Sequence, residues 1–242
     1  MRRRASVAVI ALLAGCAGAA PVAGPATTTT TATTAPPPAA LDLVAEAAGP
    51  TLEVFDEADD DGRPAMTLRA ADEVGGRLVL PVDAPPTADG WIAVDLAVRP
   101  NGSHGFVRAD DVDLATTPFR IAIDLGAHRL VVRRGDEVVV DTAIGIGNEA
   151  PPVPGSFFLR DLLQPAEPFG DYGPFAYTLS GFALTTTSVL GGDGRLAIHG
   201  TNHPEDLAVD GGPGSIRVTN DVITYLVRRV RPPLGTRVDV EG

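Results

Sequence analysis

The 242-residue chain contains a single cysteine, Cys16, and no lysine. One cysteine cannot form an intramolecular disulfide or build a thiolate metal cluster. Cys16 lies in the N-terminal leader, so the part of the sequence that is expected to fold contains no thiol, which excludes a cysteine nucleophile there. All 19 basic residues are arginine, a composition that suggests a GC-rich bacterial genome.

Positive charge is also scarce: the chain has 19 basic and 31 acidic residues, and its formal net charge is −12. Removing a leader that carries Arg2, Arg3 and Arg4 would change −12 to −15. An acidic body repels nucleic acid and anionic lipid headgroups. Neither is therefore expected as a general partner.

The sequence has no hydrophobic run long enough to span a bilayer. Its leader carries a ten-residue apolar stretch, Ala5 to Ala14, whereas a membrane-spanning helix needs about 20. The stretch ends in Leu-Ala-Gly-Cys at Cys16, which resembles the lipobox of bacterial lipoproteins. Residues 1–16 are therefore predicted to be a signal peptide, with Cys16 lipidated and the protein exported, anchored to the cell membrane and facing the cell wall or periplasm. The alternative is an ordinary secretory leader with a chance cysteine.

Two segments follow the leader. Residues 17–40 are rich in Ala, Thr and Pro and predict an unstructured tether. Residues 41–115 predict a small β-barrel domain, because five short apolar or alternating runs are separated by turn-forming clusters. The runs are Leu52 to Phe55, Met66 to Leu68, Arg77 to Pro81, Trp91 to Leu96 and Gly105 to Val107. Trp91 is expected in the core, with ligand stacking as the less favoured role.

Residues 118–242 predict a second domain that is also mainly β. Phe119 to Leu125 and Arg129 to Arg134 alternate apolar with polar residues, and a turn then leads into Glu137 to Ile146. Asp221 to Val230 has helical spacing, with Thr219 or Asn220 available as the N-cap. This domain is therefore expected to combine strands with one short helix near its end.

Two features of acyl-transfer chemistry lie between His199 and Arg217. An apolar run, Arg195 to Ile198, predicts a buried strand that ends at His199, and sixteen residues later a Gly/Pro-rich loop presents Ser215. An imidazole and a nucleophile-type side chain at loop ends are the groups that acyl transfer requires. Both residue types are common at loop ends, so this pattern alone is a weak signal.

The same stretch resembles the active-site signature of the L,D-transpeptidase family, bacterial enzymes that remodel peptidoglycan. The family pattern is HG followed after a fixed gap by S-H-G-C-[I/V]-R, and the chain matches it at residues 199–202, Gly214, Ile216, Arg217 and Asn220. The phrases around Trp91 are similar to the bacterial Src-homology-type barrel that precedes the catalytic domain in related proteins. The resemblance implies a mainly β fold, in which that small barrel precedes an L,D-transpeptidase-type β-sandwich with one or two short helices.

The resemblance also implies a site and a substrate. His199 would be the general base and Ser215 the nucleophile acting on peptidoglycan stem peptides, with no cofactor and no metal. Thr201 or Asn202 would orient the imidazole. Residues that would shape the pocket or contact substrate are Gly200, Thr201, Gly214, Arg217, Tyr172 and Tyr177, and for the two tyrosines a structural role is at least as well supported.

The departures from the family pattern lie at the positions that would carry out the reaction. Ser215 stands where the family has its nucleophilic cysteine, Pro213 replaces the second histidine, and Gly212 replaces the serine. A serine hydroxyl lacks the thiolate reserve of a cysteine, and proline removes a backbone N–H. Weak or lost activity is therefore predicted, with a non-catalytic peptidoglycan-binding protein or a scaffold lipoprotein as alternatives. His203 could be a replacement base or half of a metal pair, although two nearby histidines are usually incidental.

Overall fold

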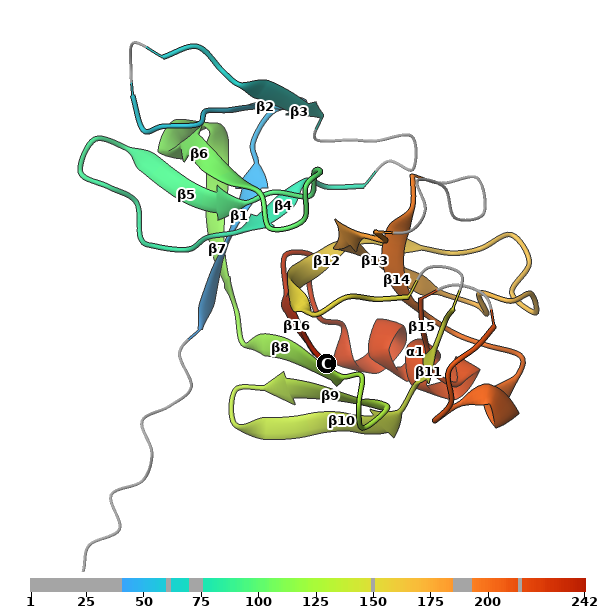
Figure 1. Cartoon of the computed structure of the whole chain (residues 1–242). Helices are drawn as coiled ribbons and strands as arrows, with labels where there is room; N and C mark the ends of the chain where they lie inside the picture. The colour runs from blue at the N-terminus through green and yellow to red at the C-terminus, as the bar shows by residue number, and fades with distance from the viewer. Residues whose placement is uncertain (1–40, 60–61, 70–75, 149–150, 185–192, 213–214) are drawn as a thin grey trace, which may run out of the picture. The chain divides into compact units, whose positions relative to one another are not determined.

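The structure is a computed structural model that describes residues 41–59, 62–69, 76–148, 151–184, 193–212 and 215–242 (Figure 1). The expected leader with Cys16, the tether, and residues 213–214 lie outside these ranges. Residues 38–242 belong to one compact unit. Among the described residues, no helix has both the length and the apolar character needed to cross a bilayer.

The first seven strands form three small sheets: β4-β1-β7, β2-β3 and β5-β6. Their bounds are β1 Asp42–Ala47, β2 Thr51–Val54, β3 Met66–Arg69, β4 Val79–Pro81, β5 Trp91–Asp95, β6 His104–Arg108 and β7 Val112–Thr117. Five of these strands were predicted from the sequence, whereas β1 and β7 were not. These two pair with each other over six residues. Their Ala-, Asp- and Glu-containing sequences have low intrinsic strand preference, so their conformation is set by this pairing.

These small sheets enclose a common apolar core. Leu52, Leu80, Ile92 and Val107 have no exposed surface. Trp91 is buried as expected, and its ring meets the edge of Phe55 with a centroid separation of 5.0 Å. The edge-to-face arrangement is a favoured geometry for aromatic pairs, and it assigns Trp91 to the core.

The remaining strands form one nine-stranded sheet, in the order β10-β9-β8-β16-β12-β13-β14-β15-β11. Their bounds are β8 Phe119–Asp124, β9 Arg129–Arg134, β10 Glu137–Ala143, β11 Gly145–Ile146, β12 Gly155–Leu163, β13 Ala176–Phe182, β14 Arg195–His199, β15 Ile216–Arg217 and β16 Arg237–Glu241. Two neighbouring pairs, β8 with β16 and β14 with β15, are parallel, and the others are antiparallel. The mainly β architecture predicted from the sequence is confirmed.

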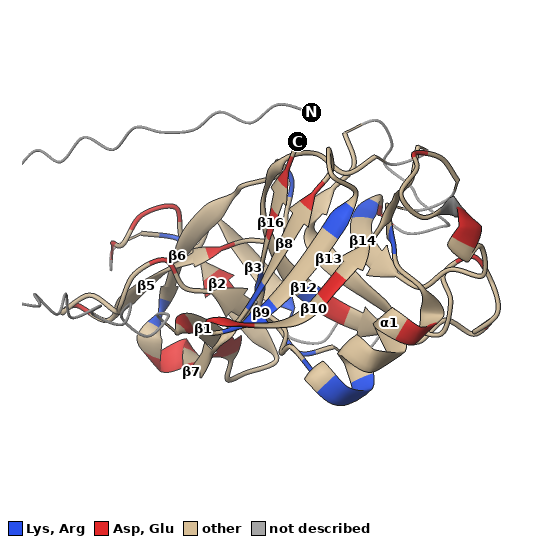
Figure 2. Cartoon of the chain, turned by 90° about the horizontal axis from the view of Figure 1, so that it is seen from below, with Lys and Arg blue, Asp and Glu red and all other residues tan. Residues whose placement is uncertain are grey.

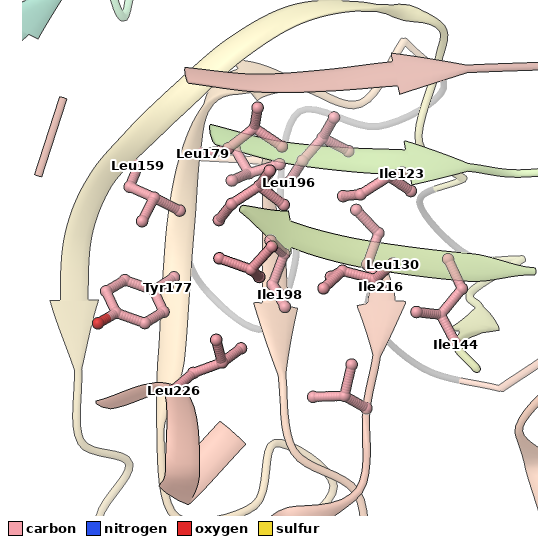
Figure 3. Close-up of a cluster of buried hydrophobic side chains, with 14 of the residues drawn as sticks. Ile123, Leu130, Ile144, Leu159, Tyr177, Leu179, Leu196, Ile198, Ile216 and Leu226 are labelled. Carbon is pink, nitrogen blue, oxygen red and sulfur yellow. The ribbon is translucent and has the colours of Figure 1, made fainter. Parts of the chain in front are cut away.

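One short helix, α1 (Asn220–Tyr225), packs on the core of this sheet and continues as a wider π-helical turn, Leu226–Val230. Its N-cap is Thr219, whose hydroxyl accepts a hydrogen bond from the backbone N–H of Val222 at 3.2 Å, as the sequence indicated. Figure 2 shows basic residues on the turn that follows α1, where positive charge suits the helix dipole. The buried side chains beneath α1 include Leu226 and Ile198 (Figure 3).

Strand β12 contributes to two cores because its side chains alternate. Phe157 packs in the core of the nine-stranded sheet, whereas the next residue, Phe158, is buried with the apolar residues of strands β1 to β7. Successive residues of a strand point to opposite faces, so one strand supplies an aromatic ring to each side. The small sheets and the large sheet are thus packed through a shared strand.

Candidate active site

The two residues expected to carry the chemistry come from neighbouring strands. His199 ends β14, and Ser215 immediately precedes β15. The strands pair in parallel, with Ile198 opposite Ile216 and His199 opposite Arg217. Side chains alternate along a strand, and Ile198 and Ile216 belong to the core, so His199, Ser215 and Arg217 share the opposite face.

The site is closed to solvent. His199 has 0% of its surface exposed, and Ser215 and Arg217 have 1% each. The backbone carbonyl of Ser215 accepts a hydrogen bond from the N–H of Gly147 at 2.8 Å, which ties this residue to the end of β11. A peptide substrate can therefore reach the hydroxyl of Ser215 only after the residues that bury it move.

The hydrogen bond at Nδ1 of His199 determines how its imidazole is protonated. Nδ1 lies 2.8 Å from the backbone carbonyl oxygen of Gly200, and a carbonyl can only accept. In the neutral ring the proton is therefore on Nδ1, and Nε2 carries the lone pair. Nε2 is buried and has no hydrogen-bond partner among the described residues. The basic nitrogen is thus free to take a proton from a nearby group.

Burial lowers the pKa of His199 from 6.5 to about 4. This value already includes three weaker influences: the Gly200 carbonyl, the largest of them, raises the pKa, the charge of Arg217 lowers it, and the Asp171 carboxylate raises it. The imidazole is consequently neutral at pH 7, the state that a general base needs, but its affinity for a proton is low.

Tyr172 covers the imidazole. Its ring stacks on that of His199 with a centroid separation of 4.4 Å and an interplanar angle of 28°. Gly173, at φ +60°, lies so close to the turn after β14 that a Cβ there would be 2.8 Å from the Cα of Gly200. This contact therefore requires glycine at position 173, and a Cβ on Gly200 would displace the side-chain amide of Asn220, whose Oδ1 would lie 2.2 Å away.

Neither residue expected to orient the imidazole does so directly. The hydroxyl of Thr201 accepts a hydrogen bond from the backbone N–H of His203 at 3.0 Å. Asn202 instead donates to the backbone carbonyls of Phe169 and Gly170. The Gly200 carbonyl orients the imidazole of His199. It could not be predicted from the sequence, because every residue type has a backbone carbonyl.

The other expected contact residues have different surroundings. Tyr177 is 4% exposed and packs among Leu159 and Ile198 in the core (Figure 3), which is the structural alternative that the sequence left open. Burial raises its pKa to about 12. A Cβ on Gly212 would lie 3.3 Å from the Arg217 guanidinium, and Gly214 is outside the described residues.

His203 is exposed, and its Nδ1 lies 3.3 Å from a carboxylate oxygen of Glu205. This surface pair gives it no contact with the buried site. Across the described ranges, no group of three or more His, Cys, Asp or Glu side chains is arranged to hold a metal ion.

Comparison with known proteins places this arrangement in a family. Residues 118–240 match the YkuD family, described as the L,D-transpeptidase catalytic domain. The chain is 28% identical over 129 residues to YkuD of Bacillus subtilis, covering 53% of this chain and 69% of that protein. It is 30% identical over 125 residues to YkuD of Bacillus licheniformis, covering 52% and 67%. Both relatives carry an L,D-transpeptidase name.

Among solved structures, an L,D-transpeptidase from Xylanimonas cellulosilytica is 18% identical to the chain, with a TM-score of 0.37. The alignment covers 52% of this chain and 62% of that one, so the match spans less than two thirds of the solved protein. The family match takes in about half of the present chain, including β14, β15 and the buried His199. The chain therefore belongs to the YkuD family of L,D-transpeptidase catalytic domains, whose activity is peptidoglycan-related acyl transfer.

Proposed function

We propose that this protein binds peptidoglycan stem peptides at His199 and Ser215 and transfers their acyl groups slowly through the serine hydroxyl. The supporting observation is the shared face of β14 and β15, which carries an imidazole with its lone pair on Nε2 and a buried hydroxyl. In this scheme Ser215 Oγ attacks the donor carbonyl and His199 Nε2 takes its proton. The terminal D-amino acid leaves with that proton. An acceptor amine then attacks the ester, forms the new amide as the bond to Ser215 Oγ breaks, and gives up a proton that returns through His199 Nε2 to Oγ.

Three features make the proposed reaction slow. A serine hydroxyl must lose its proton as it attacks, whereas a cysteine is already a few per cent thiolate at neutral pH. A histidine with a pKa of about 4 is a weak base at pH 7. Pro213 has no backbone N–H, and if the N–H groups of this loop form the oxyanion hole, the missing donor costs about 10²- to 10³-fold in rate.

The second candidate function is binding of the same peptides without turnover. It is favoured by the finding that no described residue, Ser215 included, donates a hydrogen bond to Nε2 of His199. A scaffold role among wall-synthesis proteins is a third possibility that depends on the leader and barrel rather than on the site.

Mass spectrometry after exposure to a carbapenem-type acylating agent, together with a tetrapeptide turnover assay, tests the proposal. We expect a slow adduct on Ser215 that disappears in Ser215→Ala and His199→Ala. Ser215→Cys should acylate more than about tenfold faster, because the thiolate restores the missing nucleophile. Sacculus binding without any wild-type adduct would favour the non-catalytic binder.

The leader adds a proposal on location. Cys16, at the end of a Leu-Ala-Gly-Cys sequence, would carry the lipid that holds the protein at the membrane outside the cell. In a bacterial host, the full-length protein should fractionate with membranes and Cys16→Ala should not. Equal membrane association of both would rule out this anchor.

A further inference from the structure

Three chain segments meet above His199. They are Phe169–Gly173, which precedes β13, Gly200–Asn202, which follows β14, and the start of α1 at Asn220. A Cβ on Gly173 would lie 2.8 Å from the Cα of Gly200, and Tyr172 of the first segment stacks on the imidazole. We name Phe169–Gly173 the cover, because Tyr172 lies against the imidazole of His199.

Asn202 connects the three segments through both ends of its side-chain amide. Its Nδ2 donates to the backbone carbonyls of Phe169 and Gly170, the latter at 3.1 Å. Its Oδ1 accepts from Nδ2 of Asn220 at 2.9 Å. These three hydrogen bonds attach the cover to the turn after β14 and to the helix, although Asn202 itself is exposed.

We propose that Asn202 is a positioning residue, which acts on His199 through Tyr172 by holding the cover closed over the imidazole. The side-chain amide of Asn202 holds the carbonyl oxygens of Phe169 and Gly170, which lie three and two residues before Tyr172. The ring of Tyr172 therefore has little freedom to move away from the imidazole. The side chain of Phe169 is 86% exposed and adds no packing of its own. The hydrogen bonds from Asn202 therefore supply restraint that apolar burial does not supply at Phe169.

This inference rests on the proposed function for its chemical consequence. An acyl group on Ser215 would be an ester, which either an acceptor amine or water could attack. A closed cover keeps water from Nε2 of His199, the base that would activate it, because Tyr172 stacks on the fully buried imidazole. Asn202 would thereby favour transfer to an amine over hydrolysis.

NMR titration of the four histidines tests the proposal without requiring activity. Opening the cover exposes His199 to water, so Asn202→Ala should raise its pKa from about 4 by about 1 or more, toward 6.5. Tyr172→Ala should do the same, and Tyr172→Phe, which retains the ring, should not. Adding Asn202→Ala to Tyr172→Ala should produce no further change, since the first acts through the second.

His203→Ala is the matched control, because it lies in the same turn but pairs with the exposed Glu205. It should leave the pKa of His199 unchanged. An unchanged pKa in Asn202→Ala, or fully additive effects of the two substitutions, would overturn the proposal. If Asn202→Ala does not fold, Asn202→Ser retains one donor and should give a smaller rise, whereas no rise would count against the proposal.

A second measurement separates this inference from the proposed function. With Ser215→Cys as background, Asn202→Ala should increase the ratio of hydrolysed to transferred acyl product about tenfold. A raised pKa of His199 with no acylation in any variant would support the role of Asn202 in holding the cover and would reject the transfer reaction. An unchanged product ratio together with an unchanged pKa would reject the cover.

Discussion

The hairpin of β13 and β14 carries a polar region at each end, and the two regions differ in how their polar atoms are paired. At one end Ala176 pairs with His199, and this is the candidate active site. At the other end Phe182 pairs with Arg195, and residues of the N-terminal sheets dock there. We call this second region the junction, defined by the contacts of Arg99, Asn101, Arg195 and Arg237.

Polar groups at the junction are bonded on several sides. Asn101 donates to the Phe182 carbonyl at 2.8 Å and accepts from the Phe182 N–H at 2.9 Å, as a neighbouring strand would. Arg237 contacts Asp95 at 2.6 Å and Asp83 at 2.7 Å. The guanidinium groups of Arg99 and Arg195 lie 4.3 and 4.4 Å from the centroid of the Phe182 ring.

The site has more unpaired polar atoms, although the junction also holds one within the described residues, Nη1 of Arg195. Nε2 of His199 and Oδ1 of Asn220 are buried without hydrogen-bond partners within the described part of the chain. An unpaired buried polar atom costs about 1–3 kcal/mol, so such atoms are rare where only stability matters. The comparison suggests that the junction contributes to stability, whereas the site retains an unfavourable arrangement that a proton or a ligand can relieve.

Removing the central cation of the junction should have the largest effect on stability. Arg237→Ala would leave Asp95 without its partner in a position where burial already raises its pKa above 3.8. We expect a loss of about 3 kcal/mol in the free energy of unfolding, measured by urea denaturation. Arg129→Ala, which breaks the exposed pair with Asp141, is the control and should leave the free energy of unfolding nearly unchanged, because solvent screens an exposed ion pair. Equal losses in both variants would contradict this reading of the junction.

Acidification should reveal the cost of the buried imidazole. Because the pKa of His199 is lowered on folding, the unfolded chain binds more protons between pH 6.5 and 4, and stability falls as the pH falls through this window. A pKa of about 4 predicts a loss of about 2 kcal/mol at pH 5 relative to pH 7. His199→Gln should lack this part of the pH dependence in parallel denaturation series. An identical pH profile in the variant would show that the imidazole titrates normally.

A smaller effect is expected when the hydrogen bonds that join the junction to β13 are removed. Asn101→Ala deletes two bonds to the Phe182 backbone and should lower the free energy of unfolding by about 1–2 kcal/mol. Ser103→Ala, in the same loop, loses an exposed bond to Pro100 and should change it by about 0.5 kcal/mol or less. The pKa of His199 should be the same in both variants. A change in that pKa would show that the two ends of the hairpin are coupled.

Most of the fold could be predicted from local pattern. The alternation in Phe119–Asp124 and Arg129–Arg134 predicted the first hairpin of the large sheet, and the spacing after Thr219 predicted α1. The strands β1 and β7 escaped prediction, because their residues favour the strand only when each has the other as a partner. The junction was also missed, since it joins residues as far apart in sequence as Asp95 and Arg237.

The site was predicted in part. Motif spacing identified His199, Ser215, Arg217 and their family, and the structure brings these three together on one face. Motif spacing could not identify the Gly200 carbonyl, which fixes the tautomer of His199, or the hydrogen bonds that connect Asn202 to the cover. Tyr172 and Tyr177 are both candidates by residue type, yet one stacks on the imidazole and the other lies in the core.

The sequence by itself determined the alternating pattern of several strands, the absence of a thiol after Cys16 and the presence of a serine at position 215. Tertiary structure decided which polar atoms are paired and which are buried alone, and hence the low pKa of His199. The physical reason is that residue identity fixes what a side chain can donate or accept. Desolvation and hydrogen bonding instead depend on neighbours that folding brings from distant parts of the chain.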